Sequence, residues 1–181
     1  MLGHRRLYIQ AFTGSGGALK ELQALETRKE VVIDVAGHRL GRAASKIAKM
    51  LLSGVKVTVV NAEKAVITGN RQAILERYKF LISRRQLTSH KRGGVWYPRR
   101  PERIFWYTIY RMLPRHNKRW REAMRRLKVY VGVPKGLEKA EKTTLPDAVL
   151  REARSRSGRL IRYITLAELS KELTGGRVNL G

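Results

Sequence analysis

The chain has 181 residues, and its 39 lysines and arginines against 14 aspartates and glutamates give it a net charge of +25. It contains no cysteine, which excludes disulfide-stabilised folds, zinc ribbons, zinc knuckles and thiol nucleophiles. Hydrophobic residues make up 43% of the chain, as in ordinary globular domains, so a wholly disordered basic tail is excluded and we expect a polyanionic partner to neutralise the charge.

The sequence gives no sign of a membrane partner. No apolar run approaches the roughly 18 residues that a transmembrane helix needs, and no apolar stretch follows Arg5 and Arg6 as it would in a signal peptide. The basic residues are not gathered on one long amphipathic helix, so binding to a membrane surface is the weaker interpretation of the charge.

Residues 1–30 are predicted to be an N-terminal extension, and residues 31–181 a single α/β domain. The extension contains a breaker-rich stretch at residues 13–17 (TGSGG). It ends in residues 18–30, where leucines at every third position fit one side of a short helix.

The first part of the domain predicts a strand, a helix and a second strand. Residues 31–36 (VVIDVA) are a continuous apolar run, typical of a strand buried on both faces. From Leu40 the apolar residues recur at helical spacing until Gly54 ends the helix. Residues 55–61 are rich in β-branched side chains and predict the next strand. This βαβ pattern indicates a parallel sheet.

Two further helices are predicted in the middle of the chain. The first follows a turn at residues 68–70, and residues 84–100 after it lack periodicity and are predicted to be a loop. The second helix begins at Pro101, which suits a first helical turn, and stops at Pro114. The first helix places Ile74, Leu75, Tyr78, Leu81 and Ile82 at core-like spacing, and the second places Ile104, Phe105, Thr108, Ile109 and Met112 on one side.

The last third predicts a short helix, two strands and a final helix. Residues 128–132 are predicted to be the third strand and residues 160–165 the fourth, with residues 134–158 irregular between them. A capping box from Thr165 to Glu168 opens the final helix. The short helix carries an apolar stripe made of Trp120, Ala123, Met124 and Leu127.

About half of the net charge lies in a quarter of the chain. Residues 84–128 hold 15 basic and 2 acidic residues, and we call this segment the basic block. Most of its cations are arginines, which suit planar, bidentate contact with phosphate. The two acidic residues, Glu102 and Glu122, fall in the first turns of predicted helices, where the helix dipole accounts for them. Paired-carboxylate catalysis and a magnesium site are therefore unsupported, and we expect no metal and no cofactor.

Aromatic residues and glycines are interleaved with these arginines. Trp96, Tyr97, Trp106, Tyr107 and Tyr110 are able to stack on unpaired bases, and packing in the core is the alternative for each of them. The stretch of Arg92, Gly93 and Gly94 lets backbone N–H groups approach a phosphate, with a plain turn as the alternative.

The turn from Gly37 to Gly41 lies between a strand and a helix, where dinucleotide-binding folds carry GxGxxG. The spacing is wrong for that motif, so we expect Gly37 to permit the turn and Gly41 to permit close packing. A ribonuclease is a second alternative, because His90 and His116, with Lys91 and Lys118, are residues suited to acid–base work on a phosphodiester.

The spread of basic residues over a loop, two helices and several turns favours folded RNA over one helix in a DNA groove. Four blocks carry a resemblance to a known family: residues 31–49 (VVIDVAGHRLGRAASKIAK), 59–70 (VVNAEKAVITGN), 92–119 (RGGVWYPRRPERIFWYTIYRMLPRHNKR) and 126–134 (RLKVYVGVP). They resemble the large-subunit ribosomal protein thirteen family, in its archaeal and eukaryotic branch, over residues 31–173.

This resemblance implies a three-layer α/β/α domain around a four-stranded, mostly parallel sheet. It also implies a structural, non-enzymatic role in the cytoplasmic ribosome. The implied partners are large-subunit ribosomal RNA and neighbouring large-subunit proteins, with no small-molecule substrate. The resemblance also implies a role in assembly of the large subunit and in translation.

The resemblance and the basic block together predict the residues that contact RNA. The positions carried over from the family are Arg39, Arg42, Lys64, Thr68, Asn70, Lys91, Arg92, Tyr97, Arg99, Arg100, Arg103, Arg111, Arg115, His116, Lys118 and Arg119. The basic block adds Arg84, Arg85, Gly93, Gly94, Arg125 and Arg126.

Three functions from different classes follow from these observations. The first is a structural ribosomal protein that binds large-subunit RNA. The second is an RNA-processing endoribonuclease that uses His90 and His116. The third is a generic nucleic-acid-compacting protein, against which the ordered α/β pattern argues, because a mere charge carrier needs no buried parallel sheet.

Overall fold

A computed structural model describes residues 29–84, 97–150, 158 and 160–176. The predicted N-terminal extension therefore lies almost wholly outside the described residues. In chain order the elements are β1 (Glu30–Asp34), α2 (Leu40–Leu52), β2 (Lys56–Val60), the 3₁₀ helix η2 (Ala62–Lys64), β3 (Val66–Thr68), α3 (Arg71–Ser83), α4 (Pro101–Met112), α5 (Arg119–Arg125), β4 (Leu127–Val129), the 3₁₀ helix η3 (Lys135–Leu137), β5 (Lys142–Thr143), β6 (Tyr163–Thr165) and α6 (Leu166–Thr174).

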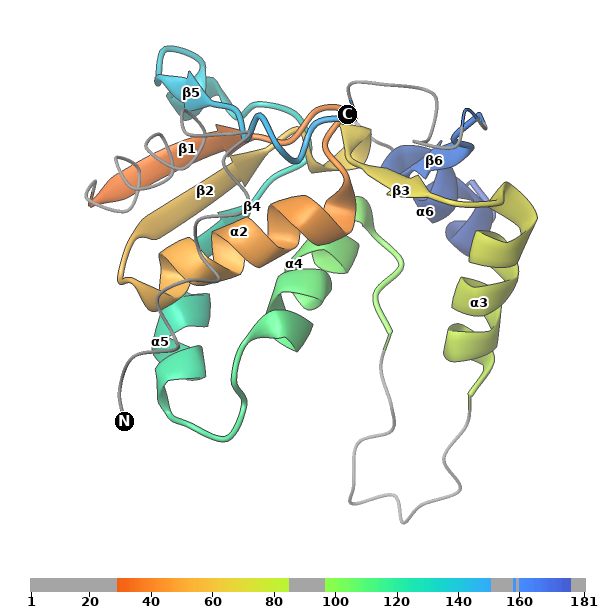
Figure 1. Ribbon diagram of the computed structural model, residues 1–181, viewed down its shortest axis with the longest axis horizontal. Helices are drawn as coiled ribbons and strands as arrows, with labels where there is room; N and C mark the ends of the chain where they lie inside the picture. Colours follow the sequence, from red (N-terminus) through yellow and green to blue (C-terminus); the bar gives the residue numbers. More distant parts are fainter. Residues whose placement is uncertain (1–28, 85–96, 151–157, 159, 177–181) are drawn as a thin grey trace, which may run out of the picture.

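The main sheet has four parallel strands in the order β4-β2-β1-β5. Strands β1 and β2 pair along their whole length, from Glu30 opposite Lys56 to Asp34 opposite Val60. Helix α2 connects them, so the predicted βαβ unit is confirmed (Figure 1). The α/β class and the four-stranded parallel sheet are confirmed with it.

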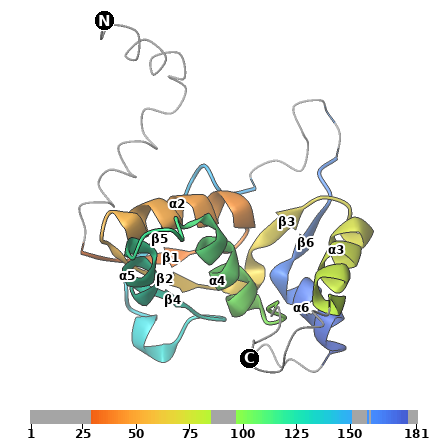
Figure 2. The same cartoon turned by 90° about the horizontal axis from the view of Figure 1, so that it is seen from below.

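One face of the sheet packs on the helices. Parallel partners point to the same face, and on this face Val31, Ile33, Val57 and Val59 are at most 4% exposed. They join the apolar stripe of α2, which buries Ala43, Ala44 and Ile47 in the same cluster. Helix α4 packs across α2, and α5 packs at the far end of α2 (Figures 1 and 2). The core therefore forms where the apolar stripe of α2, which repeats about every 3.6 residues, packs on the inward-facing alternate residues of β1 and β2.

A second group of elements lies beside the main sheet, at the right of Figure 1. Strands β3 and β6 pair antiparallel, and helices α3 and α6 pack on each other. The Thr165 hydroxyl accepts a hydrogen bond from the Glu168 N–H (3.2 Å), so the predicted N-cap of α6 is confirmed.

The fourth strand of the main sheet is not the predicted one. Residues 160–165 do contain a strand, β6, but it pairs with β3 in the second sheet. The edge position beside β1 is taken by β5, which lies in the segment predicted to be irregular. Strand β5 has two residues, one of them a lysine, so it is too short to show an alternating pattern. Its extended conformation is recognised only from its pairing with β1.

Two helices bury fewer apolar side chains than their spacing suggested. Met112 is 42% exposed because α4 ends there and Leu113, the next residue, enters the core instead. None of the residues of α3 is buried, although Ile74, Leu75 and Tyr78 pack against the edge of the core. Helix α3 packs mainly on α6, so its apolar side has less protein to pack on.

Candidate nucleic-acid interface

Helices α4 and α5 and their connection at residues 113–118 form an arginine-rich surface. Ile104, Phe105 and Ile109 face the core from α4, so its basic residues lie on the remaining sides. Leu113 is buried at the start of the connection, which leaves the residues after it outside. We define the arginine-rich surface by its exposed predicted residues: Arg99, Arg100, Arg103, Arg111, Arg115, His116, Lys118, Arg119 and Arg125.

Aromatic side chains pack against one another along this surface. Trp106 and Tyr110 stack with ring centroids 5.5 Å apart, and Trp120 meets Tyr110 edge-on, also at 5.5 Å. Tyr107 lies 6.0 Å from Tyr97 and 6.0 Å from Tyr110. All five rings are partly exposed, so they are neither plain core residues nor free stacking platforms. We call these five residues the aromatic cluster.

The aromatic cluster positions arginines of the surface. The guanidinium of Arg111 lies 6.0 Å from the centre of the Tyr107 ring, and that of Arg115 lies 5.7 Å from the Tyr110 ring. Arg121, which the sequence analysis did not select, lies 5.5 Å from the Trp120 ring. Guanidinium groups held on rings keep their N–H donors at the rim, available to an anion. The surface is therefore partly organised before any ligand arrives.

The acidic residues of the basic block lie where they were predicted. Glu102 and Glu122 occupy the first turns of α4 and α5, where the helix dipole favours a negative charge. They leave most of the positive charge of the block uncompensated within the block itself. This excess of arginine suits a polyanionic ligand.

Two predicted residues far from the block in sequence lie beside it in space. Arg39 precedes α2 and Thr68 ends β3, and both line a cavity that also contains Tyr97 and Arg111. The cavity also contains Arg77 of α3, which the sequence analysis missed. No pattern in the sequence pointed to Arg77, because its place depends on how α3 packs against the β3–β6 sheet.

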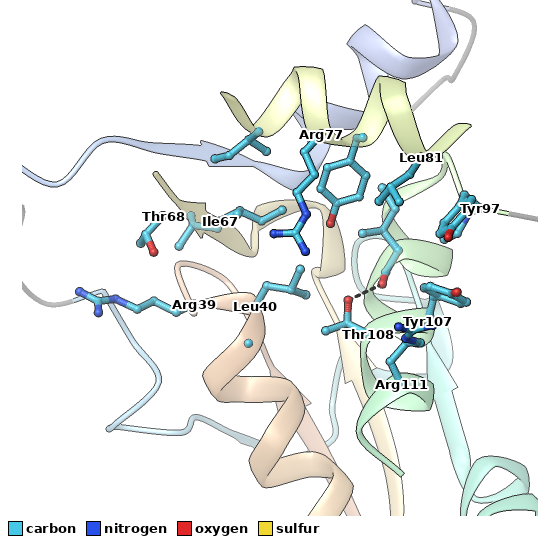
Figure 3. A pocket seen from close by; sticks show the side chains of 16 residues that line it. Arg39, Leu40, Ile67, Thr68, Arg77, Leu81, Tyr97, Tyr107, Thr108 and Arg111 are labelled. Atoms are coloured by element: carbon cyan, nitrogen blue, oxygen red, sulfur yellow. Dashed lines mark hydrogen bonds between the residues drawn. The ribbon is translucent and has the colours of Figure 1, made fainter. Parts of the chain in front are cut away.

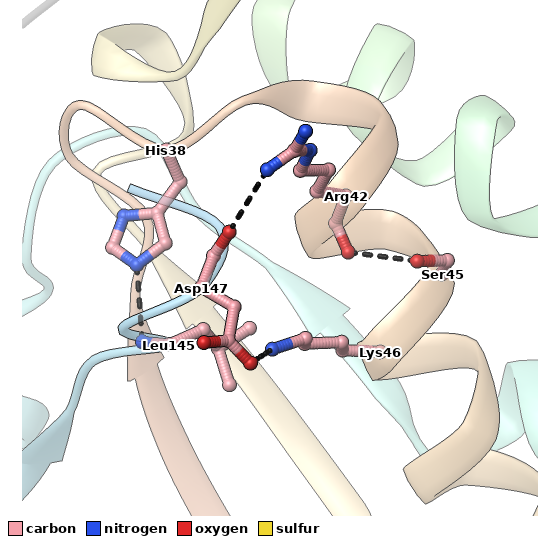
Figure 4. A network of polar contacts seen from close by, with 6 residues as sticks. All are labelled: His38, Arg42, Ser45, Lys46, Leu145 and Asp147. Atoms are coloured by element: carbon pink, nitrogen blue, oxygen red, sulfur yellow. Dashed lines mark hydrogen bonds and ion pairs between the residues drawn. The ribbon is translucent and has the colours of Figure 1, made fainter. Parts of the chain in front are cut away.

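Three predicted residues have partners inside the chain. The Asn70 side chain accepts a hydrogen bond from the Gln72 N–H (3.2 Å) and caps α3. Arg126 is partly buried and donates to the Leu51 carbonyl (3.2 Å). Arg42 donates weakly to the Asp147 carbonyl (3.5 Å), as Figure 4 shows. These contacts give the three residues structural roles, and their contact with RNA stays a prediction.

The remaining predicted residues divide between exposed positions and undescribed ones. Lys64 is exposed after β2, and the exposed Arg84 lies 4.8 Å from the Phe80 ring at the end of α3. Outside the described residues lie Arg85, Lys91, Arg92, Gly93 and Gly94, together with His90 of the ribonuclease alternative. His116 is exposed on the arginine-rich surface.

The turn after β1 is closed by the chain itself. Gly37 has φ +67°, so its predicted role in the turn is confirmed. The N–H of Gly37 donates to the Lys64 carbonyl (3.1 Å), that of His38 to Val35 (3.0 Å) and that of Arg39 to Ala148 (2.8 Å). These donors are not available to a phosphate, in agreement with the rejected dinucleotide motif. The expected close packing at Gly41 is wrong, because a Cβ there would meet nothing within 4 Å.

The crevice where open α/β sheets bind ligands is also filled from within. It lies at the carboxyl ends of β1 and β5, where the strand order changes direction. Leu145 and Ala148 occupy it and are fully buried. The Leu145 N–H donates to Nε2 of the buried His38 (3.1 Å; Figure 4). The ring proton therefore sits on Nδ1, which donates to the Ala36 carbonyl (2.9 Å).

Two carboxylates and an asparagine near the carboxyl ends of β1 and β2 form, with His38, a set that we call the closed cluster: Asp34, His38, Asn61 and Glu63. One oxygen of Asp34 accepts from the Ala36 N–H (2.9 Å) and from the Asn61 amide (3.0 Å). Asn61 has φ 57°, a conformation that asparagine tolerates better than most residues. Glu63 accepts from the Gly132 N–H (2.9 Å). These side chains tie the ends of the strands together.

Other classes of site find no support in the described part of the chain. No group of three or more His, Asp or Glu side chains there is placed to hold a metal ion. The described helices also lack the combination of length and hydrophobicity that a bilayer crossing requires.

Comparisons with known proteins agree on one family. Residues 28–136 match the family model described as Ribosomal protein L13. The chain is 47% identical over 142 residues to the large ribosomal subunit protein uL13 of Archaeoglobus fulgidus, a match that covers 78% of this chain and 86% of that protein. The uL13 protein of Methanocaldococcus jannaschii is 43% identical over 142 residues (78% and 96%). That of Sulfolobus acidocaldarius is 41% identical over 145 residues (80% and 93%).

Proposed function

Since the chain belongs to the ribosomal protein L13 family, we propose that it is a structural component of the large ribosomal subunit and binds ribosomal RNA through the arginine-rich surface. The membership agrees with the resemblance seen in four sequence blocks. The observation that supports the contact surface best is the set of exposed arginines held on the aromatic cluster.

The surface fits RNA through charge and shape together. Its arginines come from two helices and a turn, so they face a partner in several directions rather than along one groove. The partly exposed rings add a platform for an unpaired base beside the phosphate contacts. The remaining predicted contacts, such as Arg39 and Lys64, extend the proposed interface towards α2 and η2.

The partners and the location follow from this role. Large-subunit ribosomal RNA is the proposed principal ligand, and neighbouring large-subunit proteins are proposed as further contacts. The proposed location is the ribosome in the cytoplasm, and the proposed role includes assembly of the subunit. The role is structural and not enzymatic, and no observation favours the ribonuclease alternative.

Salt dependence gives a quantitative form of the proposal. If about 10 cations meet phosphates, at roughly 0.7 counterions per contact, log K falls with log salt at a slope of about −7. A fourfold rise in salt then weakens binding by about 10⁴. Titration of large-subunit RNA with the purified chain at several salt concentrations measures this slope, and a slope shallower than about −3 contradicts the proposal.

Sedimentation tests the proposed assembly directly. A lysate in moderate salt is separated on a sucrose gradient, and each fraction is probed for this chain. We expect the chain to migrate with the large subunit and to stay there after a salt wash. A peak near the top of the gradient contradicts the ribosomal role.

A further inference from the structure

A cavity of about 570 Å³ lies between the first turn of α2, strand β3, helix α3 and helix α4 (Figure 3). Its volume falls within the roughly 300–1,000 Å³ typical of small-ligand sites. Its walls come from three stretches of the chain that are well separated in sequence: residues 39–41, 66–81 and 97–111. We call it the α3–α4 cavity.

The lining of the α3–α4 cavity combines positive charge with aromatic and aliphatic surface. Three arginines, Arg39, Arg77 and Arg111, line it, and none of the lining residues that the structure describes is an aspartate or glutamate. In Figure 3 the guanidinium of Arg77 points into the space between Ile67 and Leu40. An uncharged ligand would leave these arginines without a counter-charge, so the lining favours a ligand that carries an anionic group.

Tyrosines line the cavity together with these arginines. Tyr97 and Tyr107 meet edge-on with their centroids 6.0 Å apart, and the guanidinium of Arg111 lies over the Tyr107 ring (Figure 3). Tyr78 lies deeper, where burial raises the pKa of its hydroxyl against the lowering effect of Arg77. The deep wall therefore offers a neutral hydroxyl, which both donates and accepts hydrogen bonds, next to apolar side chains.

We propose that the α3–α4 cavity receives one unpaired nucleotide of the ribosomal RNA. The base enters between the tyrosines and the aliphatic side chains, and its phosphate faces the guanidinium of Arg77, which points into the cavity. This proposal rests on the proposed RNA-binding function and gives it a defined subsite. A planar ring joined to an anion matches the lining better than an apolar peptide side chain does, because such a side chain brings no negative charge to the three arginines.

The position of Gly41 allows the cavity to be filled without removing a contact. Gly41 lines the cavity, its backbone is helical, and a Cβ there would meet nothing within 4 Å. A Gly41→Leu variant therefore adds bulk to the cavity lining from a position where a Cβ has open space. Ser45 is exposed one turn further along α2 and does not line the cavity, so Ser45→Leu is the matched control.

The test is ultraviolet crosslinking in assembled large subunits that carry the full-length chain. Mass spectrometry of the digested subunits then maps nucleotide adducts on its peptides. We expect an adduct on Tyr97 or Tyr107 in the wild type and in Ser45→Leu, and a loss of about tenfold in Gly41→Leu. Adducts on the Trp120 peptide should persist in all three. Arg77→Ala, which changes an exposed side chain, should reduce the same tyrosine adduct.

Three outcomes overturn the proposal. In the first, the tyrosine adduct is absent from the wild type although the Trp120 peptide carries RNA. In the second, the adduct is as strong in Gly41→Leu as in Ser45→Leu. In the third, the tyrosines crosslink to another ribosomal protein instead of RNA, which assigns the cavity to a protein partner. If the wild-type chain is missing from large subunits, the proposed function fails as well, so the two failures are distinguishable.

Discussion

The arginine-rich surface and the closed cluster are both rich in polar side chains, but they differ in where their partners come from. In the closed cluster, His38, Asp34 and Glu63 find their hydrogen-bond partners among backbone groups and side chains of the chain itself. On the arginine-rich surface, Arg111 and Arg115 lie on aromatic rings, with few carboxylates nearby in sequence.

This difference separates polar residues that build the fold from polar residues that we propose to meet a ligand. Groups satisfied internally contribute stability and have little left to offer a partner. Cations that repel one another without a nearby counter-charge add little stability and favour an anionic ligand. We therefore expect substitutions in the two regions to affect different measurements.

The largest effect is expected from reversing charge on the arginine-rich surface. Arg99, Arg100 and Arg103 are exposed, so changing all three to Glu should leave the fold intact. RNA affinity should fall by roughly 10²–10³, and the slope of log K against log salt should become shallower by about 2. Filter binding across a salt series measures both quantities.

A matched triple variant controls for charge alone. Lys135, Lys139 and Lys171 are exposed outside the basic block, and reversing them changes the net charge by the same amount. An equal loss of affinity in this control would mean that binding follows overall charge and that the contrast between the two regions is wrong.

The closed cluster should respond in stability and not in binding. His38→Leu removes the acceptor of the Leu145 N–H in a buried place, which should cost about 2–3 kcal/mol of the free energy of unfolding. Urea denaturation measures this loss. RNA affinity of the folded variant should equal that of the wild type, and a weakened affinity would place His38 in the interface.

Tyr110 is expected to contribute both to stability and to RNA binding. It is partly buried against the core, and its ring contacts Trp106, Trp120 and Arg115. Tyr110→Ala should cost about 2 kcal/mol of stability, because the site is only partly buried. It should also weaken RNA binding by about tenfold, since Arg115 loses its platform. Tyr110→Phe keeps the ring and should show neither effect, so a large loss there would assign the role to the hydroxyl.

The smallest effect is expected at the ion pair between Lys46 and Asp147 (Figure 4). The two side chains are 19% and 43% exposed, so water screens their attraction. Asp147→Asn should change the free energy of unfolding by less than about 1 kcal/mol and leave RNA binding unchanged. Thermal denaturation checks the first expectation, and a loss well above that figure would mean that the pair belongs to the closed cluster.

Much of the fold could be predicted from the sequence, because the longer elements carry strong local patterns. The βαβ unit, α4 between two prolines and the N-cap at Thr165 were all predicted. The partners of the short strands were not predictable. β5 and β6 are two and three residues long, and the sheet that each one joins is decided by packing far along the chain.

The residue types of the candidate site could be predicted, but not which of these residues lie together in space. The spacing of arginines and aromatics indicated RNA, and the exposed residues of α4 and α5 agree with that pattern. The approach of Arg39 and Arg77 to Tyr97 depends on tertiary contacts that no local pattern contains. Likewise, Arg126 looked like its neighbours in sequence, but its guanidinium turns inward to Leu51.

The absence of cysteine allows the contrast between the two regions to be measured directly in the large subunit. A single cysteine is placed either at Lys118, on the arginine-rich surface, or at Thr144, which is exposed beside the closed cluster. Each carries a tethered iron chelate that cleaves nearby RNA backbone through hydroxyl radicals. We predict strong cleavage of ribosomal RNA from position 118 and weak cleavage from position 144. Equal or stronger cleavage from position 144 would contradict the assignment of the RNA-facing surface.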